Sequence, residues 1–346
     1  MGSLCCLMNK ISSEAENVQR KVGETMINDL PDDLLVQILL LVPTKDAVAT
    51  MILSKRWLSI WTMMSKLNYK DNKKIIDSEC KSVWQFLDKS LKIHKAPVLE
   101  SISVHLGRQC PVDEDVGKWI TNVIDRKVCE LFFTLNWSPK PIKLPDSLYT
   151  CHTLVHLRLS RKILVELVSH SYLPSLTRLD LKCVFFKDED SLVRLLSGCH
   201  NLKDLYVKRH IEDNVKNFKV KVSSLKFLVY VYEKNHSIEY TRGSLVIDSY
   251  ALTKVIVYDN SGDSCTIENT PHLDKASIFV MCYPGGKFMF SSLIFFDVHL
   301  NIATVRVDIS LTVTFVPSGY ISNDHLCSDY IHCRLSVVPL LISLSL

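Results

Sequence analysis

Between residues 27 and 61, hydrophobic positions recur at helical spacing and are interrupted by single prolines. In the first predicted helix, which begins near Pro31 and ends at Pro43, the apolar positions are Leu34, Leu35, Ile38, Leu39, Leu41 and Val42. They cover more than one face. Thr44 is expected to cap a second helix, and Ser54 to open a third that carries Trp57. About forty residues cannot bury a sizeable core alone, so we expect this unit to complete itself against a partner.

The same stretch resembles the F-box, which has a Leu-Pro pair, an acidic turn, an apolar helix and two characteristic closing runs. In this chain the matching residues are Leu30-Pro31, Asp32-Asp33, Leu34 to Val42, Pro43-Thr44-Lys45-Asp46 and Leu53-Ser54-Lys55-Arg56-Trp57. The resemblance implies docking on the Skp-type adaptor of a Skp–cullin–F-box ubiquitin ligase, and through it on the cullin and RING subunits. It implies that adaptor binding, or the fold behind it, is carried by Leu30, Pro31, Leu34, Leu35, Ile38, Leu39, Pro43, Leu53 and Trp57. The alternative is an ordinary helical core within the chain.

Beyond the polar residues 70–80, an L-x-x-L-x-L pattern recurs along the chain. Its eight units begin at Leu99, Val128, Leu154, Leu176, Leu202, Leu225, Leu252 and, more weakly, Leu273. These first positions are 21 to 29 residues apart, the spacing of leucine-rich repeats. A leucine-rich chain produces single matches by chance, but eight at consistent spacing predict short strands stacked around a continuous core. Between two of them, residues 188–202 predict a helix with an acidic start and a stop at Gly198, and residues 144–154 a smaller version of it.

The repeats and the segments between them resemble plant F-box proteins with leucine-rich repeats, a group that often carries a C-terminal FBD domain. The likeness runs from about residue 27 to about residue 285, and no FBD region is recognisable beyond Phe290. The expected fold class is an α+β solenoid, with a three-helix F-box followed by about eight irregular repeats. The predicted segments are a disordered leader (1–26), the F-box (27–70), a linker with a first helical segment (71–97), the repeats (98–299) and a divergent tail (300–346).

Composition favours a binding protein of the cell interior. The formal net charge is +4, from 41 basic and 37 acidic residues. This small excess does not predict binding to nucleic acid or to an anionic membrane. The twelve cysteines contain no C-x-x-C pair and predict reduced thiols. No apolar run approaches the ~20 residues that span a bilayer. Cys6 stands where N-myristoylation needs Ser or Thr, which argues against a lipid anchor. The family resemblance implies the nucleus or the cytoplasm.

Candidate catalytic and metal-binding patterns are weak. His152 and His156 are four residues apart but lack the Glu of a zinc-protease helix. Gly285-Gly286-Lys287 lacks the earlier glycine of a phosphate-binding loop. We therefore expect no catalytic residue, metal or cofactor.

The repeat geometry predicts a binding surface instead. Residues that flank the inner leucines of each unit point away from the core and line one concave face, which changes from mixed charge to apolar and aromatic along the chain. The predicted client-binding residues are Arg158, Arg178, Lys182, Tyr206, Lys208, Phe227 and Tyr258. The alternative is a solvated strand face that the tail partly covers.

The leading hypothesis is a non-catalytic, substrate-recognition subunit of a Skp–cullin–F-box ligase, with an unidentified protein client. The alternatives are a non-productive relative that competes for the Skp-type adaptor, and a stand-alone leucine-rich-repeat interaction module. An enzyme with an unrecognised site ranks below all of these.

Overall fold

The structure is a computed structural model, and it describes residues 27–70, 81–107, 115–136, 140–233, 243–261, 263–282 and 292–299. The chain divides after Val104 into two compact units, which we describe separately. The leader and the tail predicted for residues 1–26 and 300–346 lie outside the described residues, as does the polar segment 71–80.

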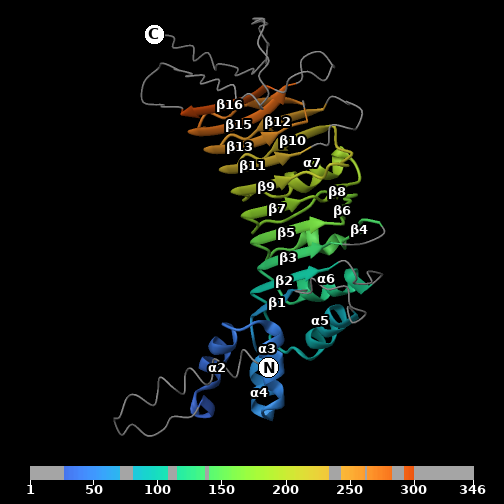
Figure 1. The fold of residues 1–346 in the computed structure, drawn as a ribbon, viewed down its shortest axis with the longest axis vertical. Helices are drawn as coiled ribbons and strands as arrows, with labels where there is room; N and C mark the ends of the chain where they lie inside the picture. The colour runs from blue at the N-terminus through green and yellow to red at the C-terminus, as the bar shows by residue number, and fades with distance from the viewer. Residues whose placement is uncertain are drawn as a thin grey trace, which may run out of the picture. The chain divides into compact units, whose positions relative to one another are not determined.

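The first unit contains four α-helices in its described residues, and the alternation of apolar stretches and prolines predicted the three short ones that come first (Figure 1). Its elements are η1 (Ile27–Asp29), α2 (Asp32–Leu39), α3 (Thr44–Ala49), η2 (Thr50–Ile52), α4 (Lys55–Thr62), β1 (Lys66–Lys70) and α5 (Lys81–Ile93). Strand β2 (Ser101–Leu106) begins in this unit and ends in the next. The core holds Leu35, Ala47, Trp57, Ile60 and Trp61, each at most 4% exposed.

Of the two helix-capping residues predicted from the sequence, one caps its helix in the structure and the other does not. Ser54 caps α4 as predicted, because its side chain accepts a hydrogen bond from the Trp57 N–H at 3.4 Å. The prediction that Thr44 caps α3 is wrong. Pro43 occupies the cap position, and Thr44 is the first helical residue. The buried Thr44 hydroxyl accepts a hydrogen bond from the Asn68 N–H at 2.7 Å, so it joins α3 to β1 instead.

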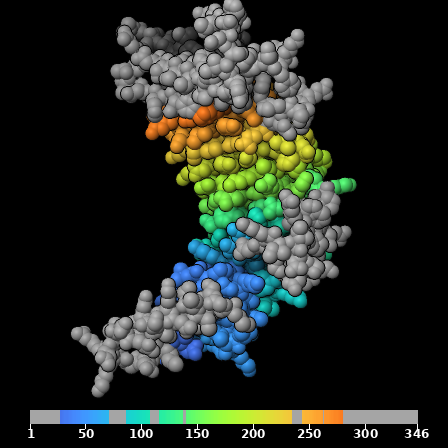
Figure 2. All heavy atoms as spheres, in the orientation of Figure 1, coloured from blue at the N-terminus to red at the C-terminus, as the bar shows by residue number. Residues whose placement is uncertain are grey.

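The second unit is built around a ladder of parallel strands stacked in chain order (Figure 1). These strands are β3 (Glu130–Leu135), β5 (His156–Arg161), β7 (Arg178–Lys182), β9 (Asp204–Lys208), β11 (Phe227–Tyr232), β13 (Lys254–Asp259) and β15 (Lys275–Cys282). Each comes from one of the predicted repeat units. Strand β16 (Ser292–His299) pairs antiparallel with β15 and so departs from the repeat geometry. In Figure 2 the coloured layers of this unit follow one another from green to orange, as stacked repeats do.

The segments that return the chain between the strands form a second layer. They are α6 (Asp115–Asp125), β4 (Ile142–Lys143), η3 (Asp146–Thr150), β6 (Ile163–Val165), β8 (Phe185–Phe186), α7 (Glu189–Ser197), β10 (Asn217–Lys221), β12 (Ser244–Asp248) and β14 (Ser264–Glu268). Two small parallel sheets, β4-β6-β8 and β10-β12-β14, belong to this layer. The inward leucines and valines of the main strands are buried, because alternate strand residues face the return segments. The predicted fold class, a helical F-box followed by a leucine-rich-repeat solenoid, is confirmed.

Helix α7 forms where its sequence pattern predicts it. Asp188 caps the helix by accepting a hydrogen bond from the Ser191 N–H at 2.7 Å, and Gly198 ends it.

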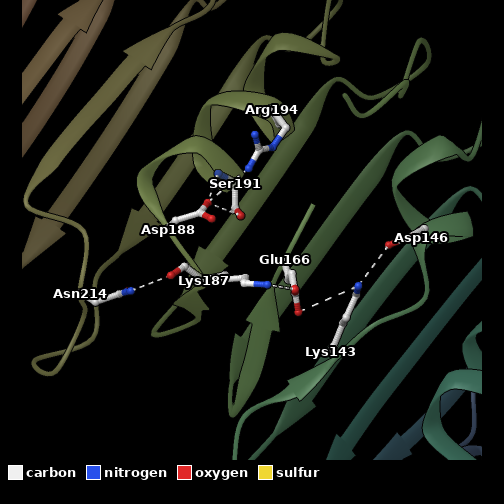
Figure 3. A network of polar contacts seen from close by, with 8 residues as sticks. All are labelled: Lys143, Asp146, Glu166, Lys187, Asp188, Ser191, Arg194 and Asn214. Atoms are coloured by element: carbon white, nitrogen blue, oxygen red, sulfur yellow. Dashed lines mark hydrogen bonds and ion pairs between the residues drawn. The ribbon is translucent and has the colours of Figure 1, made fainter. Parts of the chain in front are cut away.

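A network of polar side chains on the return layer surrounds the start of α7 (Figure 3). Glu166 pairs with Lys187 and lies 4.0 Å from the Lys143 ammonium, which links successive repeats. Because these lysine side chains are exposed, the ion pairs connect neighbouring repeats but add little to the stability of the fold.

Within the described residues, no helix has both the length and the apolar character needed to cross a membrane.

Candidate functional site

The nine predicted adaptor-binding residues separate into a buried group and a surface group. Leu35, Leu39 and Trp57 are at most 4% exposed and belong to the core of the first unit. The surface group consists of Leu30, Pro31, Leu34, Ile38, Pro43 and Leu53, of which Leu30 is half-buried and the rest are exposed. The division follows helical spacing on α2, where the i, i+4 pair Leu35 and Leu39 faces inward. The adjacent pair, Leu34 and Ile38, is 40% and 36% exposed.

Further apolar side chains on the surface of the first unit were not assigned to the site from the sequence. Leu41 just after α2 is 85% exposed, Ile52 in η2 is 75% exposed, and Met51 and Leu58 are each 41% exposed. An unusually apolar surface on so small a unit indicates an interaction site. Three of these four positions lie outside the α-helices, so their apolar character was the signal that the sequence offered.

Arg56 and Trp57, at the start of α4, hold the segment that precedes α2. Arg56 Nε donates to Asp32 Oδ1 at 2.9 Å, and its two terminal nitrogens donate to the backbone carbonyls of Asn28 and Leu30. Trp57 Nε1 donates to Asn28 Oδ1 at 3.1 Å. Both residues lie in the closing run of the F-box-like pattern, but the role of Arg56 was not predicted from the sequence.

In the second unit, strand register brings the predicted client-binding residues to one face of the main sheet. Parallel pairing places side chains in rows across neighbouring strands. Arg178 and Phe227 lie in a first row with His156, Asp204 and Lys254, and Arg158 and Tyr206 in a second with Asp180, Val229 and Ile256. Lys182, Lys208 and Tyr258 lie in a third row with Ser160 and Val231. We call these three rows the strand face; the seven predicted residues are half-buried or exposed on it.

A buried carboxylate anchors the charged end of the strand face. Asp180 is only 1% exposed, since it lies 2.7 Å from Arg158, 3.2 Å from Arg178 and 3.4 Å from His156. Burial by itself would raise the pKa of Asp180, but the hydrogen bonds from these three side chains hold it well below its usual range. This role of Asp180 was not predicted from the sequence. The available signal was its position two residues after Arg178 on the same strand face and opposite Arg158 on the neighbouring strand.

Aromatic rings and a second carboxylate also contact basic side chains of the strand face. The Arg158 guanidinium lies 4.9 Å from the Phe132 ring centroid, and the Lys182 ammonium lies 4.8 Å from that of Tyr206. Lys208 pairs with Glu233 at 2.9 Å, and this ion pair raises its pKa. The basic groups are therefore held in place, and part of their charge is already compensated.

The opposite end of the strand face is apolar. Phe227, Val229, Val231, Ile256 and Tyr258 are half-buried on the neighbouring strands β11 and β13. Such a surface can bind an apolar segment of another protein beside the charged end of the strand face.

A second group of buried charges closes the carboxyl ends of the strands rather than forming a binding site. Arg209 Nε donates to Asp213 Oδ2 at 2.8 Å, and Arg209 Nη1 donates to the Tyr230 hydroxyl at 3.1 Å. The Arg209 guanidinium also lies 4.0 Å from the Tyr232 ring centroid. Both charged side chains are at most 2% exposed. In the part of the chain that the structure describes, no group of three or more His, Cys, Asp or Glu side chains could hold a metal ion.

Comparison with known proteins links both units to characterised families. Residues 27–69 match the F-box domain, and residues 116–289 match the family described as "FBD-associated F-box protein At5g56370, LRR repeats". The chain is 49% identical to the putative FBD-associated F-box protein At1g05080 of Arabidopsis thaliana, covering 84% of this chain and 67% of that protein. It is 48% identical to the putative F-box/FBD/LRR-repeat protein At1g22000 of Arabidopsis thaliana, covering 80% of this chain and 61% of that protein. The chain thus spans about two thirds of the length of these relatives.

Proposed function

This chain belongs to the plant F-box/FBD/LRR-repeat family, and from that premise we propose that it is a substrate-recognition subunit of a Skp–cullin–F-box ubiquitin ligase. The first unit docks on a Skp-type adaptor, through which it joins the cullin and RING subunits. The second unit holds a protein client in the nucleus or the cytoplasm. The chain itself makes and breaks no covalent bond, and its contribution to the reaction is proximity.

The observation that carries the proposal is the pairing of a closed core with an apolar surface in the first unit. Leu35, Leu39 and Trp57 fill the core, so the exposed Leu34 and Ile38 are not needed to complete it. Complete burial of a fully exposed side chain of this size contributes about 1.5–3 kcal/mol, and covering the exposed part of Leu34 or Ile38 contributes a fraction of that. Several such residues together supply the driving force of a stable protein–protein interface.

The test of adaptor docking is co-purification of the full chain with a Skp-type adaptor. In the variant Leu34→Asp/Ile38→Asp, two charges enter the exposed surface while the core is untouched, and we expect adaptor binding to be lost. The matched control is Val193→Asp, an exposed apolar position of similar accessibility (45%) on α7. Binding that survives in the double variant, or is lost equally in the control, would contradict adaptor docking by this surface.

We assign client binding to the strand face because it combines immobilised basic groups with an adjoining apolar and aromatic region. The residues proposed to contact the client are Arg158, Arg178, Lys182, Tyr206, Lys208, Phe227 and Tyr258. Arg and aromatic residues at such positions form energetic centres of interfaces, since little side-chain entropy remains to be lost.

The client test compares two triple variants for the proteins whose ubiquitination depends on the chain. One is Arg178→Glu/Lys208→Glu/Phe227→Ala on the strand face. The other is the control Lys219→Glu/Lys221→Glu/Val193→Ala on the return layer, where these side chains are exposed. We expect the strand-face variant to lose client ubiquitination while it keeps the adaptor, and the control to keep both. Unchanged client ubiquitination in the first variant would place the client elsewhere.

A further inference from the structure

We infer that Arg56 is a positioning residue that holds Leu30 and Pro31 ready for adaptor docking before the adaptor arrives. We call the contacts of Arg56 with Asn28, Leu30 and Asp32 the Arg56 latch. This inference rests on the proposed docking of the first unit on a Skp-type adaptor, and it adds a residue whose role is to prepare the surface.

The described segment before α2 buries no complete side chain. Element η1 is a single turn of three residues, none of them buried, and Ile27 is 38% exposed. The backbone hydrogen bond from the Leu30 N–H to the Ile27 carbonyl is 3.4 Å long. A short segment without buried side chains gains too little from burial to offset the entropy of ordering its backbone. Its position must therefore come from contacts with the rest of the unit.

Arg56 supplies those contacts from a rigid base. Helix α4 is anchored by the buried Trp57, Ile60 and Trp61, so the Arg56 backbone cannot drift. From there the guanidinium group reaches three acceptors: the carbonyls of Asn28 and Leu30 and the carboxylate of Asp32. The carboxylate also forms an ion pair, with Nη2 2.7 Å from Asp32 Oδ1.

The planar fork of arginine is what allows one side chain to fix both ends of this segment. A lysine ammonium is a compact charge on a flexible stem and lacks the fixed fork that grips two carbonyls and a carboxylate together. The adjacent Trp57 donates to the Asn28 side chain at 3.1 Å and fixes the same segment from a second direction. As a result, the segment that leads into α2 is held in place, with Leu30 and Pro31 directly before the first turn of the helix that carries the exposed Leu34.

Ordering the segment in advance removes an entropic cost that would otherwise fall on adaptor binding. A chain without the latch would present Leu30 and Pro31 in the docking arrangement for only a fraction of the time, and its apparent affinity would fall by that fraction.

The decisive experiment measures the affinity of the full chain for a purified Skp-type adaptor and the amide hydrogen exchange of the free chain. Arg56→Lys keeps the charge opposite Asp32 but removes the fork, and we expect the dissociation constant to rise about tenfold. Exchange at the Asp29 and Leu30 amides of the free chain should accelerate, while exchange at Ile60 and Trp61 stays unchanged. Asn28→Ala should act in the same direction and less strongly, and Lys55→Gln, an exposed neighbour on α4, is the control.

The outcomes separate the latch from the docking proposal. If Arg56→Lys binds like the wild type while Leu34→Asp/Ile38→Asp loses binding, docking stands and the latch is wrong. If binding weakens without faster exchange at Asp29 and Leu30, Arg56 acts by touching the adaptor, and positioning is overturned. If Leu34→Asp/Ile38→Asp binds like the wild type, the docking surface itself is wrong and the latch falls with it.

Discussion

The carboxylate of Asp180 on β7 accepts a hydrogen bond from Arg158 Nε on the adjacent strand β5 at 2.7 Å. This contact explains how an acidic side chain on the open face of a sheet comes to be 1% exposed. Arg178, two residues before Asp180 on the same strand, closes the other side at 3.2 Å. One buried negative charge thus orients two arginines on the strand face.

Replacing Asp180 with Asn should lower the free energy of unfolding at pH 7 by about 1–3 kcal/mol, because Arg158 and Arg178 lose their shared counter-charge. The folded-state pKa of Asp180 lies below its unfolded value. Its stabilisation is therefore present above about pH 4 and is lost as the pH falls further. Urea unfolding of wild type and variant at pH 7 and pH 3 should show a difference that shrinks at the lower pH. The exposed Asp190→Asn serves as control, and a difference independent of pH would contradict this account.

For Asp259, at the end of β13, we expect the opposite pH dependence of the free energy of unfolding. Burial raises the pKa of Asp259 to about 6, although its Oδ1 accepts a hydrogen bond from the Ser261 N–H at 2.7 Å. Because the folded pKa exceeds the unfolded one, stability is fully present below about pH 4 and declines as the pH rises to about 6. An Asn at this position imitates the protonated carboxyl group. Asp259→Asn should raise the free energy of unfolding at pH 7.5 by about 1–3 kcal/mol and leave it unchanged at pH 4.

The Asp259 measurement is again urea unfolding, now at pH 7.5 and pH 4, with the exposed Asp274→Asn as control. A variant that is less stable than the wild type at pH 7.5 would show that the Asp259 carboxylate makes a favourable ionic contact in the folded protein.

Neighbouring leucines on α2 should respond differently to truncation. Leu35→Ala leaves a cavity in the core and should destabilise the first unit by about 2–5 kcal/mol. Leu34→Ala removes a surface side chain and should change stability by no more than about 0.5 kcal/mol while weakening adaptor binding. Hydrogen exchange of the α2 and α4 amides reports on the first unit alone. Equal losses of protection in both variants would mean that Leu34 is also part of the core.

Gly198 at the end of α7 should not tolerate a side chain. A Cβ atom at this position would overlap the backbone carbonyl of Ser171, and the Gly198 carbonyl accepts a hydrogen bond from the Leu173 N–H at 3.0 Å. Gly198→Ala should therefore lower the free energy of unfolding by about 1–3 kcal/mol, through a forced shift of the backbone. Ser197→Ala, at the exposed neighbouring position, is the control in thermal unfolding. A fully stable Gly198→Ala variant would show that the two segments can separate without cost.

Gly198 also shows where sequence reasoning stops. Its place after an apolar helical pattern predicted the end of α7. The φ angle of −87° is one that any residue adopts, so the need for glycine comes from the approach of Ser171 and not from the turn. Thr44 gives the same lesson, since a local cap was predicted and the hydroxyl accepts from Asn68 instead. Both contacts join segments more than twenty residues apart, which no local pattern encodes.

The sequence by itself determined the two units, the helices between the prolines and the strands of the repeats, because apolar spacing dictates which element can bury its side chains. It also determined which residues of each repeat strand leave the core, because strand side chains alternate. Only the tertiary structure decided that Leu34 and Ile38 reach the surface while Leu35 and Leu39 do not. It alone placed Arg56 against Asn28 and Leu30, and Asp180 beneath Arg158. Such contacts depend on the packing of distant segments, whose energies appear only when the chain is folded.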